Sequence, residues 1–508
     1  MRRAIIVMVL AAQSAGADPV FVDRAASLPE PHVYAGGWEH FVGGGVAVFD
    51  CDADGRPEIF ASGGENPARL FLNRTPAAGA PLRFEPGQVP RLTGVTGAYP
   101  IDIDGHGWLD LAVLRVGPDK LLRGGPDCSF VDATAAWGLD PRDAWTTAFA
   151  ATWEKGQHLP TLAFGHYVDR ADPDGPFEAC DTSDLYRPVG TGYGAPKTIA
   201  PGFCALSMLI TDWQRKGEPE LRISNDRHYY VRGGYEQMFR IDPLVERTEN
   251  WPRVSLWGMG IASQDLNGDG LPEVMMTSMG DQLLQFNTGS GFTDAPYALG
   301  TYAQRPFIGD DGRPSTGWHA EFADVDNDGR MDLFIAKGNV DQMPSNAIHD
   351  PNNLLMQQPD GSFAERADVA GIATTHRSRG AALADFDGDG RLDLVVVNRR
   401  APMELWQNVT PQTGHWAAVE PRMEGGNSRA VGAWVEVRAG GRVTAREVTV
   451  GGGHAGGQAG PLHFGLGADT EPQVRVIWPD GAVSRWPALP ADRITELWPD
   501  GEALRLGR

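Results

Sequence analysis

An acidic motif recurs five times in this 508-residue chain. Each copy has oxygen-bearing or imidazole side chains at positions one, three and five, a glycine at six and a carboxylate at nine, and an apolar run follows directly. The copies are Asp50-Asp52-Asp54-Gly55-Glu58, Asp102-Asp104-His106-Gly107-Asp110, Asp265-Asn267-Asp269-Gly270-Glu273, Asp324-Asp326-Asp328-Gly329-Asp332 and Asp385-Asp387-Asp389-Gly390-Asp393. A chain that repeats one loop between β-like runs is restricted to repeat architectures.

The spacing predicts calcium loops within β-hairpins. Oxygens at positions one, three and five converge, the glycine at six permits a sharp turn, and position seven offers its carbonyl. Carboxylates about 4 Å apart repel by roughly 4 kcal/mol per pair at an effective dielectric near 20, so such a cluster needs a cation. Hard oxygen ligands favour calcium over zinc or copper. The position-seven residues are Arg56, Trp108, Leu271, Arg330 and Arg391.

The alternative for any single copy is an ordinary Asp-Gly turn. We expect four calcium sites, in the loops that begin at Asp50, Asp265, Asp324 and Asp385. A fifth site at Asp102 is left open, because His106 stands where a carboxylate is usual.

Two degenerate copies extend the repeat. They surround Gly156 and Gly217 and place Lys155 and Lys216 at position five. Either a lysine ammonium replaces the metal or the site has drifted, and both interpretations predict no calcium there. The seven position-six glycines are spaced by 49 to 61 residues, which indicates a seven-bladed β-propeller.

A second signature follows most loops: an apolar pair ending in Asn or Gln, and then a Gly-x-Phe step. The seventh repeat lacks the Phe strand, and an unassigned copy, 21–24, precedes the first repeat. We expect this N-terminal strand to complete the last blade. These residues resemble the FG-GAP or VCBS repeats of integrin α-subunit propellers, which implies an all-β propeller over residues 18–410.

The acidic loops stop after Thr410, and residues 411–508 are expected to form a separate small β domain. Strands are expected at 416–419, 431–437, 443–450, 474–478 and 494–498. The stretches 427–433, 446–448, 462–467 and 476–481 resemble the ASPIC/UnbV domain, which follows such a propeller in the cartilage acidic protein family. The resemblance implies a calcium-binding extracellular protein. The stretch 451–458 departs from the family, so that if this loop contacts a partner, its specificity is expected to differ.

The N-terminus indicates export. Residues 1–17 have the basic start, short apolar run and small-residue end of a signal peptide, so we expect a periplasmic or secreted protein. No later apolar run approaches the roughly 20 residues of a membrane helix. The formal charge of −22 argues against a nucleic-acid partner.

Four cysteines in an exported chain suggest disulfides. Cys180 and Cys204 bracket an irregular segment and are the expected pair. Cys51 and Cys128 either pair across neighbouring blades or remain buried thiols.

No catalytic motif stands out. His319, His166 and the string 228–230 offer isolated acids or bases, and a lone histidine beside an aromatic residue is more often structural. We expect a non-enzyme that acts in adhesion or in extracellular protein or glycan recognition, with the segment 169–204 as a recognition surface or a simple cap. The alternative is a calcium-dependent polysaccharide lyase or hydrolase on a propeller scaffold.

Overall fold

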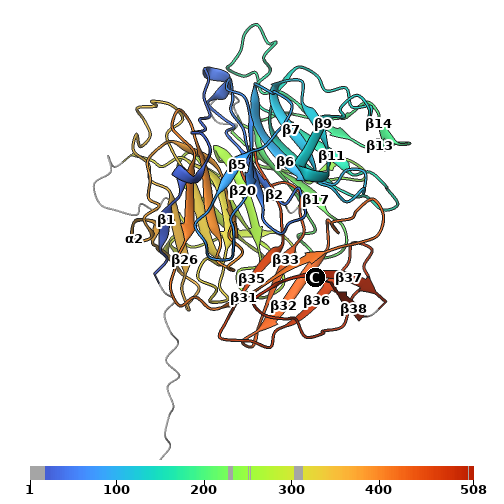
Figure 1. The fold of residues 1–508 in the computed structure, drawn as a ribbon. Coiled ribbons are helices and arrows are strands. Elements are labelled where there is room, and N and C mark those ends of the chain that lie inside the picture. The colour runs from blue at the N-terminus through green and yellow to red at the C-terminus, as the bar shows by residue number, and fades with distance from the viewer. Residues whose placement is uncertain are drawn as a thin grey trace, which may run out of the picture.

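The computed structural model describes residues 18–226, 233–249, 251, 253–302, 313–501 and 503–507. The predicted signal peptide therefore lies outside the described residues. The fold is all-β: seven blades of four strands each form a ring, and a C-terminal domain of two further sheets lies against one side of it (Figure 1). In the described part of the chain, no helix is long and apolar enough to cross a membrane.

Each blade is antiparallel, and its four strands are ordered from the ring centre outward; they follow chain order in blades 1 to 6, whereas the outermost strand of blade 7 comes from the N-terminus. Blade 1 is β2 (Val46–Phe49), β3 (Glu58–Ala61), β4 (Arg69–Asn73) and β5 (Phe84–Pro86); blade 2 is β6 (Val95–Ile101), β7 (Asp110–Gly117), β8 (Lys120–Gly125) and β9 (Ser129–Asp132); blade 3 is β10 (Ala144–Thr152), β11 (Thr161–His166), β12 (Ser183–Tyr186) and β15 (Lys197–Ile199).

The remaining blades repeat this order. Blade 4 is β16 (Ala205–Thr211), β17 (Glu220–Asn225), β18 (Gln237–Arg240) and β19 (Val245–Glu246); blade 5 is β20 (Gly258–Gln264), β21 (Glu273–Ser278), β22 (Leu283–Asn287) and β23 (Phe292–Asp294); blade 6 is β24 (Gly317–Ala323), β25 (Asp332–Lys337), β26 (Asn353–Gln357) and β27 (Phe363–Glu365); blade 7 is β28 (Ser378–Ala384), β29 (Asp393–Asn398), β30 (Glu404–Asn408) and β1 (Phe21–Asp23).

The N-terminal strand closes the ring, as the sequence predicts. β1 pairs with β30 as the fourth strand of blade 7, with Phe21 opposite Asn408. The inner strands contact one another in the order β2, β6, β10, β16, β20, β24 and β28, and β28 contacts β2. The last blade therefore has no unpaired outer edge left by its missing strand.

Apolar residues on the faces of neighbouring blades pack together and form the core. All residues of β2, β6, β10 and β16 are buried, because each inner strand is covered on both sides. The Asn or Gln that ends the third strand ties its blade to the acidic loop of the preceding blade. Its side-chain amide donates to a loop carbonyl: Asn73 to Phe386 (2.8 Å), Asn287 to Trp213 (2.7 Å), Gln357 to Leu266 (3.4 Å) and Asn408 to Val325 (3.0 Å).

The C-terminal domain consists of two sheets that enclose one apolar core. One sheet contains β31 (His415–Pro421), β35 (Leu462–Gly467), β37 (Ile494–Asp500) and β38 (Ala503–Leu506); the other contains β32 (Trp434–Ala439), β33 (Arg442–Glu447) and β36 (Gln473–Ile477). The strand expected at 443–450 ends at Glu447, because the chain there turns into the ring. The strands β35 and β38 are not among those predicted from the sequence.

Short elements connect the strands. They are η1 (Ala25–Ser27), η2 (Trp38–His40), η3 (Pro126–Cys128), η4 (Tyr297–Leu299), α2 (Ala367–Ala370) and the hairpin of β13 (Pro188–Val189) with β14 (Gly192–Tyr193). This hairpin belongs to the segment 169–204 and projects sideways from the outer edge of the ring (Figure 1). Disulfides join Cys180 to Cys204 at the base of this segment and Cys51 of blade 1 to Cys128 of blade 2.

Candidate metal sites and the filled channel

All seven loops share one backbone turn. The position-six glycines have φ between +73° and +95°, a region that other residues rarely adopt: Gly55, Gly107, Gly156, Gly217, Gly270, Gly329 and Gly390. In six loops the N–H of this glycine donates to the position-one carboxylate; for example, Gly55 donates to Asp50 at 2.8 Å and Gly217 to Asp212 at 2.7 Å. The carboxylate at position one therefore shapes the turn even in the degenerate loop of blade 4.

Four loops gather three or four candidate ligands, with ligand atoms within 4.8 Å of one another. The groups are Asp50, Asp52 and Glu58; Asp102, Asp104, His106 and Asp110; Asp324, Asp326 and Asp332; and Asp385, Asp387 and Asp393. The loop 265–273 does not bring three such groups together. There the Asn267 amide donates to Glu273 at 3.3 Å, and Asp265 accepts from Gly268 and Gly270.

The carboxylate at position five does not converge with those at positions one and three, although the spacing predicts that it does. The position-five carboxylate turns back and accepts the backbone N–H of position seven, in the pairs Arg56 to Asp54, Leu271 to Asp269, Arg330 to Asp328 and Arg391 to Asp389. Where position seven is arginine, its guanidinium also pairs with this carboxylate. In blades 1, 6 and 7 the clusters therefore consist of positions one, three and nine, and the position-five acid is held at their rim.

The carboxylate at position nine joins three strands. In blade 6, Asp332 accepts the N–H of Val325 at 3.1 Å and of Gln357 at 2.9 Å. In blade 7, Asp393 accepts from Phe386 and Asn408 in the same way. This role is structural, and it leaves further lone pairs of each oxygen for a cation.

Burial makes these carboxylates costly to ionise without a cation. It raises the pKa of Glu58 to about 8 and that of Glu273 to about 8, with neighbouring loop aspartates adding to the shift. Burial together with Asp326 raises the pKa of Asp332 well above its usual range. In the blade 1 loop, the buried Asp50 Oδ1 has no hydrogen-bond partner within the described chain. An unpartnered buried oxygen beside two further carboxylates fits a hard cation such as calcium.

His106 changes the chemistry of the blade 2 loop. Its Nε2 lies 3.0 Å from the Gly124 carbonyl, so this nitrogen carries a proton. Its Nδ1 lies 2.6 Å from Asp104 Oδ1 and 3.3 Å from Asp102 Oδ1. Burial lowers the pKa of His106, but the Gly124 carbonyl and the nearby Asp110 and Asp104 outweigh it, so the pKa is raised. Since Nε2 carries the ring proton, Nδ1 and the carboxylate oxygens of Asp102 and Asp104 are all acceptors. Either a second proton, on Nδ1, or a bound metal ion must therefore lie between them.

In the two blades with degenerate loops, arginine side chains provide the positive charge that pairs with the loop carboxylate. Arg187 Nε lies 2.6 Å from Glu154 in blade 3, and Arg247 Nη2 lies 2.7 Å from the buried Glu220 in blade 4. Lys155 and Lys216 are exposed. The interpretation that a lysine ammonium occupies the place of the metal is therefore wrong, because the charge comes from arginines that follow the later strands of each blade.

The C-terminal domain is seated on the face of the ring that carries the loops. Its contacts include Ser428 Oγ to Asp102 Oδ2 (2.5 Å), Arg215 Nη2 to Glu436 (2.7 Å), Asp212 N–H to Glu447 (2.9 Å), His463 Nε2 to Asn327 Oδ1 (2.7 Å) and Gly467 N–H to the Asn327 carbonyl (2.8 Å). The loops therefore form the platform on which the domain rests.

The segment 450–459 leaves the C-terminal domain and fills the centre of the ring. Residues Gln458–Ala459 form β34, which pairs in parallel with β2. Hydrogen bonds reach the inner strands of six blades: Val48 N–H to Gly457 O (3.2 Å), Ala98 N–H to Ala455 O (3.1 Å), Ala151 N–H to Val450 O (3.0 Å), Gly452 N–H to Met208 O (2.7 Å), Gly453 N–H to Ile261 O (2.7 Å) and His454 N–H to His319 Nδ1 (3.2 Å). This segment contains the stretch that departs from the family pattern, and its described contacts are within the chain.

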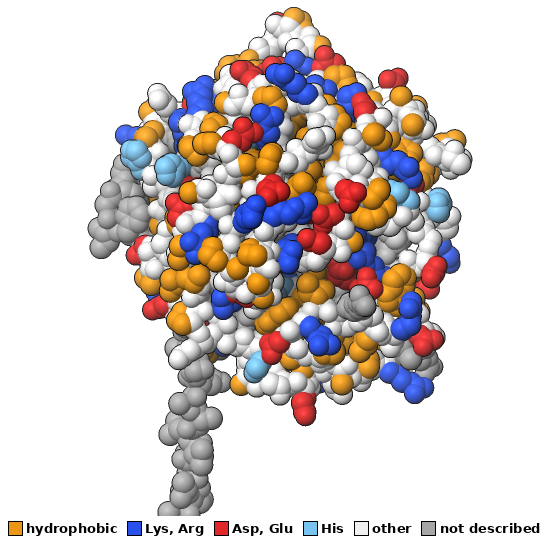
Figure 2. All heavy atoms as spheres, in the orientation of Figure 1, with side chains coloured by type: hydrophobic (Ala, Val, Ile, Leu, Met, Phe, Trp, Pro, Cys, Tyr) orange, Lys and Arg blue, Asp and Glu red, His pale blue; other side chains and the backbone are white. Residues whose placement is uncertain are grey.

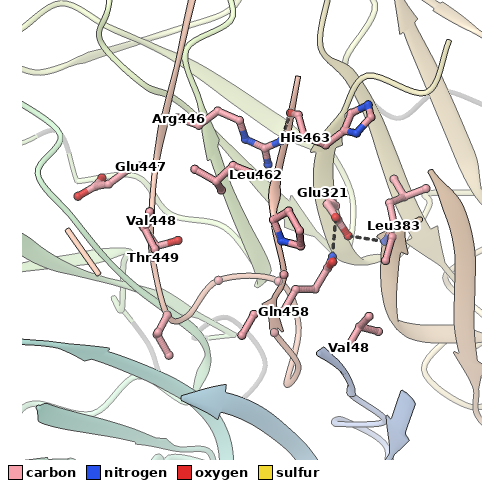
Figure 3. A pocket seen from close by; sticks show the side chains of 18 of the residues that line it. Val48, Glu321, Leu383, Arg446, Glu447, Val448, Thr449, Gln458, Leu462 and His463 are labelled. Carbon is pink, nitrogen blue, oxygen red and sulfur yellow. Dashed lines mark hydrogen bonds between the residues drawn. The ribbon is translucent and has the colours of Figure 1, made fainter. Parts of the chain in front are cut away.

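A cavity of about 300 Å³ remains beside this segment, where the ring meets the C-terminal domain. Figure 3 shows Glu321 and Gln458 pointing toward each other in the lining of the cavity, which Arg446, Thr449 and Leu462 of the C-terminal region also line. Gln458 Nε2 donates to Glu321 at 2.6 Å, and the N–H of Leu383 donates to the same carboxylate at 3.1 Å. The polar groups of Glu321 are therefore used to hold the segment in place.

The described histidines that were considered as acids or bases are buried and make hydrogen bonds within the fold. His319 is buried and accepts the His454 N–H, and His166 is buried between Thr146 (3.0 Å) and Asp184 (3.1 Å). The string 228–230 lies outside the described residues. The surface in Figure 2 shows acidic and basic side chains interspersed, because many of the excess acids are buried in the loops.

Comparison with protein families identifies both parts of the chain. The model for the FG-GAP-like repeat matches residues 50–113, 265–335 and 341–396, and the model for ASPIC and UnbV matches residues 423–503. The first range covers loops in blades 1 and 2, and the others cover blades 5 to 7.

Two curated relatives are cartilage acidic protein 1. The mouse protein (Mus musculus) is 29% identical over 165 residues, which is 31% of this chain and 25% of the relative. The protein of Xenopus tropicalis is 26% identical over 235 residues, or 44% of this chain and 34% of the relative. The chain thus spans a quarter to a third of the length of these relatives.

Among solved structures, BBS1N in complex with ARL6DN is similar at 10% identity, with a TM-score of 0.46, over 76% of this chain and 96% of that chain. Similarity at this level does not bear on function. The repeats and the C-terminal domain are matched in the order in which the chain carries them. The chain is therefore an FG-GAP repeat protein with a C-terminal ASPIC and UnbV domain.

Proposed function

We propose that this protein is an exported, calcium-binding recognition module without catalytic activity, which binds an extracellular protein or glycan. The relatives named cartilage acidic protein 1 and the two disulfides support an extracellular setting, since disulfides persist in oxidising compartments. The predicted signal peptide at 1–17 is consistent with export.

Calcium would bind in the loops 50–58, 324–332 and 385–393, and more weakly at 265–273, where Asn267 replaces a carboxylate. The first three loops each gather three carboxylates, and burial raises the pKa of the closing acids Glu58, Asp332 and Asp393. The ion would neutralise these charges and make each hairpin rigid. In the loop 102–110, the imidazolium of His106 would compete with a metal.

The observation that carries the recognition role is the placement of the C-terminal domain. It covers the loop face, and its segment 450–459 fills the channel, so a partner would bind on the opposite face. That face carries residues 169–182, the first part of the disulfide-pinned segment 169–204, and the loops that follow the second strands. His319 and His166, the described candidates for acid–base catalysis, are buried.

The test is binding of the full chain to a panel of polysaccharides and extracellular proteins, in millimolar calcium and in chelator. We expect saturable, calcium-dependent binding with no new reducing ends or unsaturated sugars. Appearance of such products would replace the proposal with a lyase or hydrolase, and the absence of any saturable binding would contradict it.

A further inference from the structure

Three arginines share one carboxylate on the face away from the C-terminal domain. Arg377 precedes β28, Arg399 and Arg400 follow β29, and Asp341 follows β25. All four lie at the strand ends opposite the acidic loops. Asp341 Oδ1 accepts Nη1 of Arg377 at 3.1 Å, of Arg399 at 2.8 Å and of Arg400 at 3.2 Å.

The cluster is positive in a chain whose formal charge is −22. A fourth arginine, Arg379, lies behind it and donates only to backbone carbonyls, those of Phe41, Arg377, Ser378, Asn339 and Val340. Burial lowers the pKa of Arg379 well below its usual range, and Arg399 lowers it further. An anion at the surface would reduce this mutual repulsion.

Two of the arginines have donors directed to solvent. The side chains of Arg377 and Arg400 are 26% and 44% exposed. Among the described residues, Arg377 donates through Nη1 and Arg400 through Nη1 and Nη2, which leaves Nε and Nη2 of Arg377 and Nε of Arg400 without a described partner. Both residues also have left-handed backbone, with φ of +60° and +56°. Non-glycine residues in this conformation persist where the surrounding structure holds them, often at functional sites.

An aromatic side chain lies beside the cluster. Trp38 begins η2 and is 37% exposed, and its ring packs edge-on against Trp145 at 4.9 Å. Arg399 Nη2 donates to the carbonyl of Gly37, the residue before Trp38, at 3.4 Å. The nearby acids Glu39 and Asp143 are paired with Arg170. Arg399 is itself buried, so the groups exposed in this region are the Trp38 ring and the guanidinium groups of Arg377 and Arg400.

We propose that Arg377 and Arg400, held in place through Asp341 and the buried Arg399 and together with Trp38, form a binding site for an acidic glycan that carries uronate carboxylates. A guanidinium fork matches a carboxylate in two parallel hydrogen bonds, and the aromatic ring offers a flat apolar surface to a sugar. The inference rests on the proposed recognition function and specifies its ligand class and its face.

The test measures binding of a galacturonate oligosaccharide, a neutral dextran oligosaccharide and a short poly-glutamate peptide to the full chain in calcium. The variant Arg377→Gln/Arg400→Gln removes two exposed charges. The matched control, Arg69→Gln/Arg83→Gln, removes two paired surface arginines of blade 1. Thermal melting in calcium checks that each variant is folded, and Trp38→Ala tests the aromatic contact.

We expect the unmodified protein and the control to bind the uronate, and the Arg377→Gln/Arg400→Gln variant to lose about tenfold or more in affinity. Equal uronate affinity in both variants, or no uronate binding by the unmodified protein, would overturn the inference. Preferential binding of poly-glutamate would also overturn it, in favour of an acidic protein. If the full chain does not bind the uronate but binds another member of the panel of polysaccharides and extracellular proteins, the uronate ligand class is wrong and the proposed recognition function stands.

Discussion

The backbone N–H of Ala98, in the inner strand of blade 2, donates to the carbonyl of Ala455 in the C-terminal segment at 3.1 Å. The contact is close because Gly97 has no side chain: a Cβ there would lie 1.7 Å from the Ala455 oxygen. Gly45, before the inner strand of blade 1, is constrained in the same way. The ring and the C-terminal domain are therefore fitted to each other at the centre of the molecule.

This fit predicts the effect of a methyl group at the channel. Gly97→Ala should displace the segment 450–459 and lower the free energy of unfolding by about 2 kcal/mol. Gly460→Ala is the control, because a Cβ at Gly460 meets no atom within 4 Å. Denaturant unfolding of both variants in calcium measures the difference. Equal stability would show that the segment does not hold the observed position.

A buried aspartate should stabilise the protein only when calcium is present. Asp326→Asn removes one of three clustered carboxylates in blade 6. In calcium at about 100 times its dissociation constant, loss of that site removes roughly 2.7 kcal/mol of stabilisation. In chelator the same change relieves like-charge repulsion, so the melting temperature should stay equal or rise. Asp360→Asn, in an exposed turn of the same blade, is the control; equal effects of Asp326→Asn in both buffers would contradict the prediction.

The pH dependence of stability follows from the raised pKa values. Folding raises the pKa of Glu58 and Glu273 from about 4.5 to about 8, so the folded protein binds more protons than the unfolded chain between these values. Without calcium, the contribution of these groups to stability is full below pH 4.5 and is lost as the pH rises towards 8. The stabilisation by calcium should therefore grow across this window. Melting curves in chelator and in calcium from pH 5.5 to 8.5 test this, and a constant difference would contradict it.

The Arg247 to Glu220 pair should be important for blade 4. Glu220 is buried, so Arg247→Gln leaves an uncompensated charge and should cost about 3 kcal/mol. Lys216→Gln, at the exposed position five of the same loop, should change stability by less than about 0.5 kcal/mol. Unfolding experiments separate the two, and a larger effect of the lysine variant would restore the rejected interpretation.

The Cys51–Cys128 disulfide should contribute more than Cys180–Cys204. It closes a separation of 77 residues, against 24 for the other bridge, so chain entropy predicts about 4.5 and about 3.4 kcal/mol respectively. Cys51→Ala/Cys128→Ala should also weaken calcium binding at the loop 50–58, because Cys51 lies within that loop. Unfolding and calcium titration of the two double variants test the order, and the reverse order would contradict this account.

The propeller could be predicted from the sequence because each blade repeats one local rule. The turn at glycines such as Gly55 and Gly329 and the carboxylates around them are close in sequence, and the missing strand of blade 7 points to the N-terminal copy at Phe21. The period of the key glycines is enough to predict seven blades.

Other features could not be predicted, because they depend on residues brought together only by folding. The channel segment binds the ring mainly through backbone atoms, which no side-chain pattern reveals. Arg247 lies 27 residues from Glu220, so their pairing depends on strand order. The position-five carboxylates do not join the clusters as expected, because each accepts the backbone N–H of position seven in the same loop.

Calcium bound to the full chain can be counted after dialysis from millimolar calcium, with a chelator-treated sample as reference. We expect about four ions per chain, and His106→Asp should raise the count by one. A chain that holds no calcium after dialysis would contradict the assignment of the acidic loops as metal sites.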